Sequence, residues 1–287
     1  GPAASAGATA ATECTPLGTL GDGNGVEISS SGCYELTQNV TSTNDDPLIW
    51  VTADDVRLRG NGFALIAGEK SETTPTATTT PSGLSVDPLG EDRVGLYVDG
   101  ATDVSVSNVV VEQYDVGVHT SLASDVRVSE TTVRQTTDSA ISVTDTDGVL
   151  VTDNELTSVA GGVDVLDSTD VLVADNSITE SLRESVAGIR VESLSFAEKN
   201  VTITDNHLNG VGPTGIAVFE TGSVVVRGNV VENVTGHTGG STPVAGIRAG
   251  SNAENTTVVN NTVENVSGVG LVISAAATTV DGGTVDQ

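Results

Sequence analysis

Aromatic side chains are scarce in this chain of 287 residues, which holds one Trp, three Tyr and three Phe. Grooves that cleave sugar chains usually present stacking rings, so this scarcity weighs against an efficient glycosidase. Positive charge is scarce too, because 11 Lys and Arg stand against 39 Asp and Glu. The formal net charge of −28 argues against a nucleic acid partner, since phosphate binding needs basic residues.

Cysteine is nearly absent, with only Cys14 and Cys33 and no Cys-x-x-Cys pair. A metal centre needs more ligands than this, so we expect no metal site. Both cysteines precede the first full repeat, and a disulfide between them would stabilise the fold by about 3 kcal/mol. Such a disulfide indicates an exported protein. No apolar run reaches the length of a membrane span.

The dense acid, the scarce lysine and the many Thr, Val and Ala are typical of proteins from very salty habitats. Concentrated counter-ions in such habitats screen the self-repulsion of an acidic surface. We therefore expect a halophilic protein that unfolds when it is diluted into low salt.

One pattern repeats through most of the chain. A Gly or another small residue precedes apolar-x-apolar, and apolar-x-apolar-x-x-Asn-x-apolar follows. The clearest copy runs from Gly162 to Ile178. The copies begin at Gly95, Gly117, Ala140, Gly162, Gly188, Gly215, Gly246 and Gly270. A looser copy starts at Pro47, with Leu48 and Trp50 as its apolar pair. Self-similarity at such a period predicts a stacked solenoid.

Each copy contains three short stretches of alternating pattern, and alternation at period two places the apolar residues on one face of a strand. Val, Ile and Thr dominate, which suits strands, and no copy contains an amphipathic helical run. The connections are too tight for a hairpin sheet. The sequence therefore predicts an all-β solenoid of about nine coils with three short strands per coil, each pairing in parallel with its equivalent in the next coil.

A recurrent Asn marks one bend of the coil. Asn tolerates the backbone angles of tight bends and hydrogen-bonds local backbone, and stacked copies can bond to one another in a ladder. We expect the ladder at Asn61, Asn154, Asn176, Asn206, Asn229 and Asn261. Val109 and Thr131 occupy the same position in two copies and should interrupt it.

The repeat resembles the right-handed parallel β-helix superfamily over about residues 25–287. That group contains pectate-lyase-like enzymes, NosD-like periplasmic proteins and carbohydrate-binding or carbohydrate-hydrolysing repeat domains of surface proteins. Segments 32–37 (GCYELT) and 55–62 (DVRLRGNG) resemble the start of its secreted haloarchaeal members. The resemblance implies a single-stranded, right-handed parallel β-helix. It leaves the activity open, because a fold does not determine a function.

The continuous repeat indicates one elongated domain with additions at its N-terminal end. We expect a disordered tail over residues 1–20, a disulfide-pinned cap over 21–46 and the β-helix over 47–287, with an inserted Thr/Pro-rich loop over 64–94. The last coil carries no obvious polar cap, although terminal repeats normally need one. We expect this end to continue in a longer chain or to pack on a partner or a second copy.

Six Asn-x-Ser/Thr sequons agree with an exported protein. Their acceptors are Asn39, Asn200, Asn233, Asn255, Asn260 and Asn265. Asn233 and Asn265 occupy equivalent positions just after a strand, so both are expected to face solvent.

In enzymes of the superfamily the active groove follows the outer face of the strand that here begins at the repeated Gly. The outward x position of that strand reads Tyr97, His119, Ser142, Asp164, Arg190, Ala217, Arg248 and Val272. Arg190 and Arg248 lie two coils apart, about 10 Å, which suits carboxylates of an acidic polysaccharide. Tyr97 and His119 are placed to contact sugar rings. We therefore expect Tyr97, His119 and Arg248 to bind substrate.

A catalytic interpretation uses Arg190, Asp164 and Glu192. The two carboxylates lie on adjacent coils, about 5 Å apart along the axis, which fits a retaining glycosidase pair or a surface calcium ion. Arg190 could act as the base of a polysaccharide lyase. The plainer interpretation is a salt-adapted acidic surface whose arginines neutralise nearby acids. The NosD-like relatives suggest copper, but the absence of Met and of free Cys argues against it, and we expect no cofactor.

We expect an exported cell-surface β-helix with a structural, adhesive or glycan-binding role and a polysaccharide or cell-surface glycan as its partner. One alternative is a polysaccharide lyase or glycoside hydrolase that acts on an acidic polysaccharide. A second is a subunit of a surface filament or viral spike that self-associates through its C-terminal coil.

Overall fold

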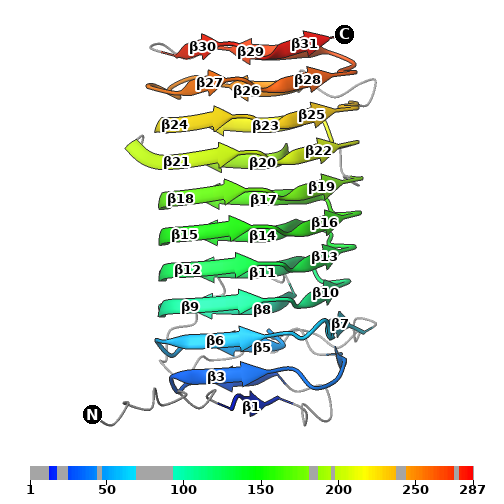
Figure 1. Cartoon of the computed structure of the whole chain (residues 1–287), viewed down its shortest axis with the longest axis vertical. Helices are drawn as coiled ribbons and strands as arrows, with labels where there is room; N and C mark the ends of the chain where they lie inside the picture. The colour runs from blue at the N-terminus through cyan, green and yellow to red at the C-terminus, as the bar shows by residue number, and fades with distance from the viewer. Residues whose placement is uncertain are drawn as a thin grey trace, which may run out of the picture.

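The computed structural model is a right-handed solenoid of parallel strands with about nine turns, and none of the residues that it describes is helical. It describes residues 13–17, 25–43, 47–68, 93–180, 187–194, 198–236, 244–274 and 278–286. The coils stack in one column from the N-terminus to the C-terminus (Figure 1). The predicted fold class is confirmed.

Three parallel sheets form the sides of the column. Sheet 1 contains β2 (Val26–Ile28), β5 (Ile49–Val51), β8 (Val94–Asp99), β11 (Val116–Ser121), β14 (Ser139–Thr144), β17 (Gly161–Leu166), β20 (Ala187–Glu192), β23 (Thr214–Phe219), β26 (Ala245–Ala249) and β29 (Val269–Ile273). Sheet 2 contains β1 (Thr15–Pro16), β3 (Gly32–Glu35), β6 (Val56–Arg59), β9 (Thr102–Ser107), β12 (Ser124–Ser129), β15 (Asp147–Thr152), β18 (Thr169–Ala174), β21 (Glu198–Thr204), β24 (Gly222–Arg227), β27 (Thr257–Val259) and β30 (Thr279–Asp281). Sheet 3 contains β4 (Val40–Ser42), β7 (Ala64–Ala67), β10 (Val110–Glu112), β13 (Thr132–Arg134), β16 (Glu155–Thr157), β19 (Ser177–Thr179), β22 (His207–Asn209), β25 (Val230–Glu232), β28 (Thr262–Glu264) and β31 (Thr284–Asp286).

The inward side chains form one apolar column. Ile189 pairs with Val163 on one side and with Ile216 on the other, and all three are almost fully buried. Each such side chain stabilises the fold by about 1.5–3 kcal/mol through burial. The small residue that opens each copy follows from this packing. A Cβ on Gly162 would lie 2.2 Å from the carbonyl oxygen of Gly188, so this position has no room for a larger side chain.

The asparagine ladder lies at the bend between sheets 2 and 3. Its Nδ2 groups donate to the Oδ1 of the Asn one coil further at 2.9 Å, in an unbroken series: Asn154, Asn176, Asn206, Asn229 and Asn261. Each member is buried, and each also donates to backbone carbonyls. Thr131 stops the ladder on the N-terminal side, as expected, although its backbone N–H still donates to Asn154.

Asn61 does not belong to this ladder, so that part of the prediction was wrong. The backbone register places Phe63 opposite Val109 at the ladder position, because Ala64 pairs with Val110. Asn61 lies two residues earlier, is exposed, has a φ of 53° and donates to Glu35 and to the carbonyl of Leu36. The bend between β6 and β7 is two residues longer than the bend between β9 and β10. The repeat pattern alone does not show this extra length.

The looser copy at Pro47 is also corrected by one residue. Ile49 and Val51 point inward and are fully buried, while Trp50 points outward and pairs with Tyr97. A slip of one residue moves every side chain of a strand to the opposite face. Because Leu48, Ile49, Trp50 and Val51 are all apolar, alternation could not identify the inward pair.

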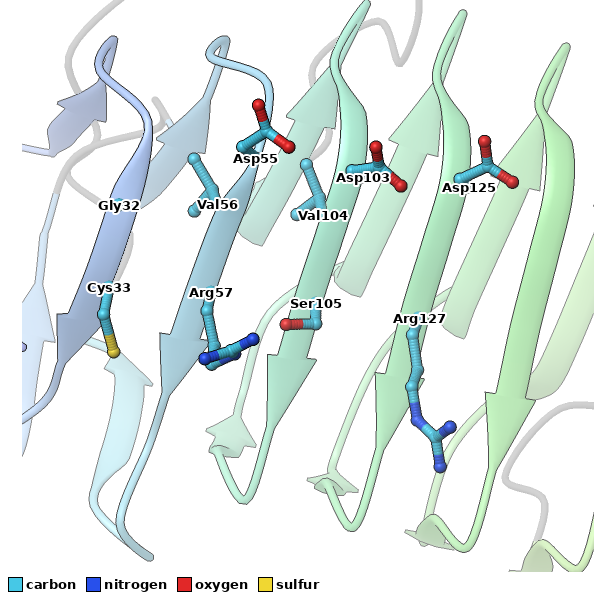
Figure 2. A pocket seen from close by; sticks show the side chains of 10 residues that line it. All are labelled: Gly32, Cys33, Asp55, Val56, Arg57, Asp103, Val104, Ser105, Asp125 and Arg127. Atoms are coloured by element: carbon cyan, nitrogen blue, oxygen red, sulfur yellow. The ribbon is translucent and has the colours of Figure 1, made fainter. Parts of the chain in front are cut away.

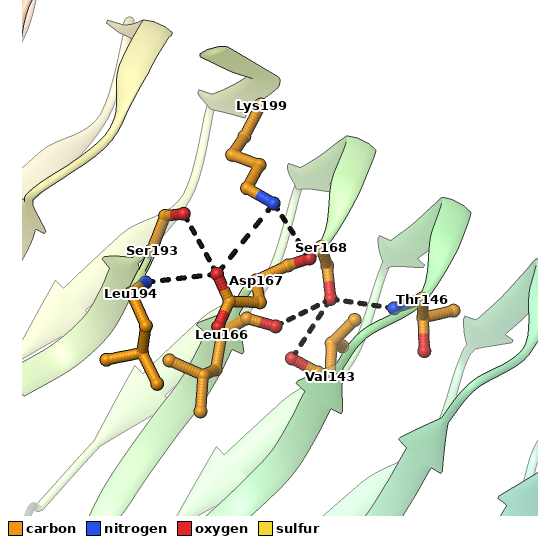
Figure 3. Close-up of polar contacts among 8 residues, drawn as sticks. All are labelled: Val143, Thr146, Leu166, Asp167, Ser168, Ser193, Leu194 and Lys199. Carbon is orange, nitrogen blue, oxygen red and sulfur yellow. Dashed lines mark hydrogen bonds and ion pairs between the residues drawn. The ribbon is translucent and has the colours of Figure 1, made fainter. Parts of the chain in front are cut away.

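The bend between sheets 1 and 2 contains a polar cluster (Figure 3). The Asp167 carboxylate accepts hydrogen bonds from the Ser193 hydroxyl at 2.9 Å and from the Leu194 backbone N–H at 3.0 Å. Lys199 donates to the Asp167 carbonyl at 3.1 Å, and its Nζ lies 3.8 Å from the carboxylate. Because Lys199 is only 9% exposed, these contacts compensate for the burial of its charge. The cluster connects two coils and has a structural role.

Parallel pairing begins earlier than expected. β1 pairs with β3 within the expected tail, and β2, β3 and β4 pair with β5, β6 and β7 within the expected cap. The predicted disulfide is present, with a Cα–Cα distance of 4.5 Å between Cys14 and Cys33. β7 and β8 occupy both ends of the segment expected as an inserted loop. Residues 1–12 and 69–92, on which much of the tail and loop predictions rest, lie outside the described residues.

Candidate functional site

One outward row follows the outer face of sheet 1, in the order expected from the repeat. Backbone pairing places its members in register: Trp50, Tyr97, His119, Ser142, Asp164, Arg190, Ala217, Arg248 and Val272. We call this line of side chains the sheet 1 row. Trp50 is the member that the sequence prediction missed, because the register there was taken one residue off.

Three rings stack at the N-terminal half of the sheet 1 row. The ring centroids of Trp50 and Tyr97 are 6.3 Å apart with the planes at 7°, and those of Tyr97 and His119 are 5.1 Å apart with the planes at 33°. Trp50 and Tyr97 are partly exposed. His119 is only 2% exposed, so the expectation that it contacts a ligand is not met, and it supports the Tyr97 ring instead.

Burial changes the protonation behaviour of this ring stack. It raises the pKa of the Tyr97 hydroxyl to about 12, with the neighbouring Asp99 carboxylate acting in the same direction. It also raises the pKa of Asp99. Burial lowers the pKa of His119 to about 4, against the opposing effect of Asp164. Tyr97 and His119 are therefore neutral near pH 7, and the partly exposed Tyr97 offers an uncharged ring to a ligand.

The expected catalytic residues lie together, but they are bound to one another. Arg190 Nε donates to Asp164 Oδ1 at 2.8 Å, and Arg190 Nη2 donates to Asp164 Oδ2 at 2.5 Å. Arg190 Nη1 lies 3.5 Å from Glu192 Oε2. The hydrogen bond to Asp164 raises the pKa of Arg190, so the neutral guanidine that a lyase base requires is strongly disfavoured. Both carboxylate oxygens of Asp164 accept hydrogen bonds from Arg190, so neither is free to contact a leaving group.

Arg248 is in a different situation. Its guanidinium carbon lies 5.3 Å from the Phe219 ring centroid, a cation–π distance, and no described residue forms an ion pair with it. Gly250 makes this arrangement possible, because a Cβ there would lie 2.4 Å from the Phe219 ring. Ala217 separates Arg248 from Arg190 in the row, because it pairs with both of them. Arg248 is therefore a positive group of the sheet 1 row that is open to a ligand.

The described residues contain no group of His, Cys, Asp or Glu that could hold a metal ion. The surface calcium ion considered for Asp164 and Glu192 gains no support, because Arg190 already occupies the space between coils. His119 lies on sheet 1 and His207 on sheet 3, where it contacts Glu232. The third histidine, His237, lies outside the described residues.

All six sequon acceptors are exposed: Asn39, Asn200, Asn233, Asn255, Asn260 and Asn265. Asn233 and Asn265 follow β25 and β28 at equivalent positions, because Glu232 pairs with Glu264. The acceptors lie outside the sheet 1 row, so glycans attached to them would start away from it. None of the described residues forms a helix long and apolar enough to cross a membrane.

A family model described as "Right handed beta helix region" matches three overlapping parts of the chain, residues 6–178, 90–237 and 139–287. No curated protein matches the chain.

Several solved structures share the fold. A double mutant of the tailspike protein of E. coli bacteriophage HK620, in complex with a pentasaccharide, has a TM-score of 0.64 and 12% identity, over 91% of this chain and 53% of that one. A single mutant of the same tailspike, also with pentasaccharide, has a TM-score of 0.66 and 11% identity, over 91% and 52%. An exopolygalacturonase from Thermotoga maritima has a TM-score of 0.50 and 13% identity, over 90% and 81%. The chain thus spans about half the length of the tailspikes, and these likenesses establish the fold alone.

Proposed function

Since the chain belongs to the right-handed β-helix family, we propose that it is a glycan-binding protein of the cell surface that uses the sheet 1 row. The observation that carries the proposal is the alignment, on one outer face, of the stacked rings of Trp50 and Tyr97 with the unpaired Arg248. Because Tyr97 lies between Trp50 and His119, the rings offer their outer edges to a sugar, and a guanidinium binds a carboxylate with two hydrogen bonds. An acidic glycan that lies along the axis would meet both.

Binding without cleavage fits this row better than catalysis. The two acids that a retaining glycosidase would need both contact Arg190, and that arginine has a raised pKa. The tailspikes with a bound pentasaccharide and the exopolygalacturonase make a glycan ligand plausible for this fold, and the specific ligand is part of the proposal.

Export to a salty exterior is part of the same proposal. The Cys14–Cys33 disulfide and the six exposed sequon acceptors support an exported, glycosylated protein. The net charge of −28 supports adaptation to high salt, as in the secreted haloarchaeal proteins that its first coil resembles. Screening at high salt would also allow such an acidic protein to approach an acidic glycan.

Incubation with acidic polysaccharides in about 1 M salt, where the Debye length is about 3 Å, tests the proposal. We expect saturable binding and no new reducing or unsaturated ends. Arg248→Ala and Tyr97→Ala should each weaken binding about tenfold, whereas Arg134→Ala, on sheet 3 in an ion pair with Glu112, should not. Equal affinities for all four proteins would show that the sheet 1 row is not the binding face.

The same incubation distinguishes the enzyme alternative. Cleavage products from the wild type, together with their loss in Arg190→Ala, would replace the binding role with a lyase or hydrolase that uses Arg190, Asp164 and Glu192. Products that persist in Arg190→Ala would point to a contaminating activity.

A filament or spike subunit is favoured by one observation, the apolar side chains exposed on the last coil. Val269, Val280 and Val285 are about half exposed, and Ile273 is 36% exposed. Light scattering at high salt should then show concentration-dependent assembly of the wild type and a monomer for the double variant Val280→Glu/Val285→Glu. A wild type that stays monomeric at every concentration would remove this alternative.

A further inference from the structure

A groove of about 500 Å³ lies on the outer face of sheet 2, near the N-terminal end of the column and separate from the sheet 1 row. It is lined by residues of β3, β6, β9 and β12 and of the bends that lead into them (Figure 2). Its volume falls within the range of about 300–1,000 Å³ that is typical of small-ligand sites.

Two arginines and a serine form one side of the groove. Ser105 pairs with Arg57 on one side and with Arg127 on the other, so the three side chains share one outward line. Both arginines are exposed. They lie two coils apart, about 10 Å, and the short Ser105 leaves a gap between them. Figure 2 shows this arrangement of long, short and long side chains.

The contacts of these two arginines leave their guanidinium groups accessible to a ligand. Among the residues that the structure describes, none forms an ion pair with Arg57 or Arg127. Arg127 Nε lies 3.4 Å from the Ser129 hydroxyl, which leaves its terminal nitrogens available. In a chain with 39 acids, two neighbouring guanidinium groups without acidic partners are open to an external anion.

Three carboxylates form the opposite side. Asp55, Asp103 and Asp125 occupy the same corner of successive coils, with φ values of 55°, 56° and 52°. Figure 2 shows them in a row across the groove from the arginines. Carboxylates accept hydrogen bonds from hydroxyl groups and repel anions. A ligand must therefore place its acids against one side and its hydroxyls against the other.

The groove is bounded along the axis. Cys33 pairs with Arg57 and comes one coil before it in the outward line of the arginines. Cys33 also forms the disulfide with Cys14. After Arg127 the line continues with Leu150 and Leu172, so two apolar side chains follow the last arginine. The groove between these two boundaries has room for a short segment of a ligand, which Arg57 would contact at one end and Arg127 at the other.

We propose that this groove is a second binding site, which takes a glycan segment with carboxylate or sulfate groups on alternate sugars. The two arginines bind the acidic groups, the intervening sugar lies over Ser105, and the aspartates accept hydroxyl hydrogen bonds. The aspartate side repels a uniform polyanion. The site is independent of the sheet 1 row, and a protein with both sites would link two glycan chains.

Calorimetry with the full chain in about 1 M salt tests the site, with a hyaluronan hexasaccharide as the alternating-acid probe. Arg57→Ala/Arg127→Ala should weaken binding at this site at least about tenfold. Arg59→Ala is the matched control, because Arg59 is an exposed arginine of the same strand that does not line the groove. Ser105→Leu should abolish binding with both charges in place, and Leu150 and Leu172 show that the fold accepts leucine in this line.

Unchanged binding in Arg57→Ala/Arg127→Ala and in Ser105→Leu would overturn the site. So would an equal loss in Arg59→Ala, or equal binding of neutral maltohexaose or of a thymidine hexanucleotide. The Arg248→Ala variant separates the two proposals. If Arg248→Ala loses binding and the groove variants keep it, the result supports the sheet 1 row alone. If the groove variants lose binding and Arg248→Ala keeps it, the result supports the groove alone.

Discussion

His119 is a buried titratable residue whose environment offers no compensation for a proton. It is 2% exposed, and neither ring nitrogen has a hydrogen-bond partner in the part of the chain that the structure describes. Tyr97 on β8 and Ser142 on β14 flank it, and Asp164 two coils away is the nearest acid that affects it. The ring therefore contributes to stability only while it is neutral.

This environment predicts a pH dependence of stability. The pKa of His119 is lowered from 6.5 in the unfolded chain to about 4 in the folded protein, so between these values the unfolded chain binds more protons. The free energy of unfolding should fall by about 3 kcal/mol as the pH falls from about 6.5 to about 4 and should not change further through this group below that. Denaturant unfolding of wild type and His119→Phe at high salt measures the difference.

Ser142, the neighbour of His119 in the same row, provides a control without a titratable side chain. Ser142→Ala should retain the pH dependence of the wild type, while His119→Phe should lose the part that lies between pH 4 and 6.5. Superimposable curves for wild type and His119→Phe would contradict the burial argument.

At the scale of the structural element, the asparagine ladder connects the same bend of five successive coils in one hydrogen-bond network. Asn206 donates to the carbonyls of Val173 and Thr204 and to the side chain of Asn229, and it accepts from Asn176. Its removal leaves several buried groups without partners.

We expect Asn206→Ala to destabilise the protein by about 3 kcal/mol, because each buried group that loses its partner costs about 1–3 kcal/mol. Asn206→Thr should cost less, since Thr131 already occupies a ladder position and its hydroxyl donates to the carbonyl of Ser129. Equilibrium unfolding in denaturant at high salt gives both values. A smaller loss for Ala than for Thr would show that volume, and not hydrogen bonding, determines stability at this bend.

The strands and their order could be predicted from the sequence because the core is periodic. From Gly95 onward, the small residue and the alternating apolar pair determine which side chains point outward, and the sheet 1 row follows. The prediction failed where the period gives no information. Four consecutive apolar residues hid the outward position of Trp50, and a longer bend displaced Asn61 from the ladder.

The roles of the charged residues were harder to predict. The repeat pattern indicated that Asp164 and Glu192 lie near Arg190, because they fall on the same coil or an adjacent one. Only the side-chain geometry shows that Arg190 donates two hydrogen bonds to Asp164. The sheet 2 groove was missed because it combines residues from the expected cap and from separate coils. Its signal in the sequence was the repetition of Arg at one outward position, in Arg57 and Arg127.

At the scale of the whole molecule, we expect acidity to determine the salt concentrations at which the column is stable. A net charge of −28 on a chain of 287 residues produces self-repulsion that salt screens. We expect the melting temperature to fall by at least about 10 °C, equivalent to a few kcal/mol at this size, between molar and 0.05 M salt. Calorimetry in NaCl measures it, and sucrose at equal osmolality is the control. A melting temperature independent of NaCl would refute salt adaptation.

The stacking of coils also gives the molecule a mechanical direction. The outermost described strand of each sheet pairs on one side only at both ends of the column, and the Cys14–Cys33 disulfide reinforces the first coil. Tension applied to the C-terminal end should peel coils singly, each releasing up to about 75 Å for a repeat such as the 22 residues from Gly95 to Gly117. Optical tweezers would record a series of separate extension steps. A single rupture would exclude unfolding by one coil at a time. A solenoid built in this way lengthens stepwise under load and dissipates work as each coil is released.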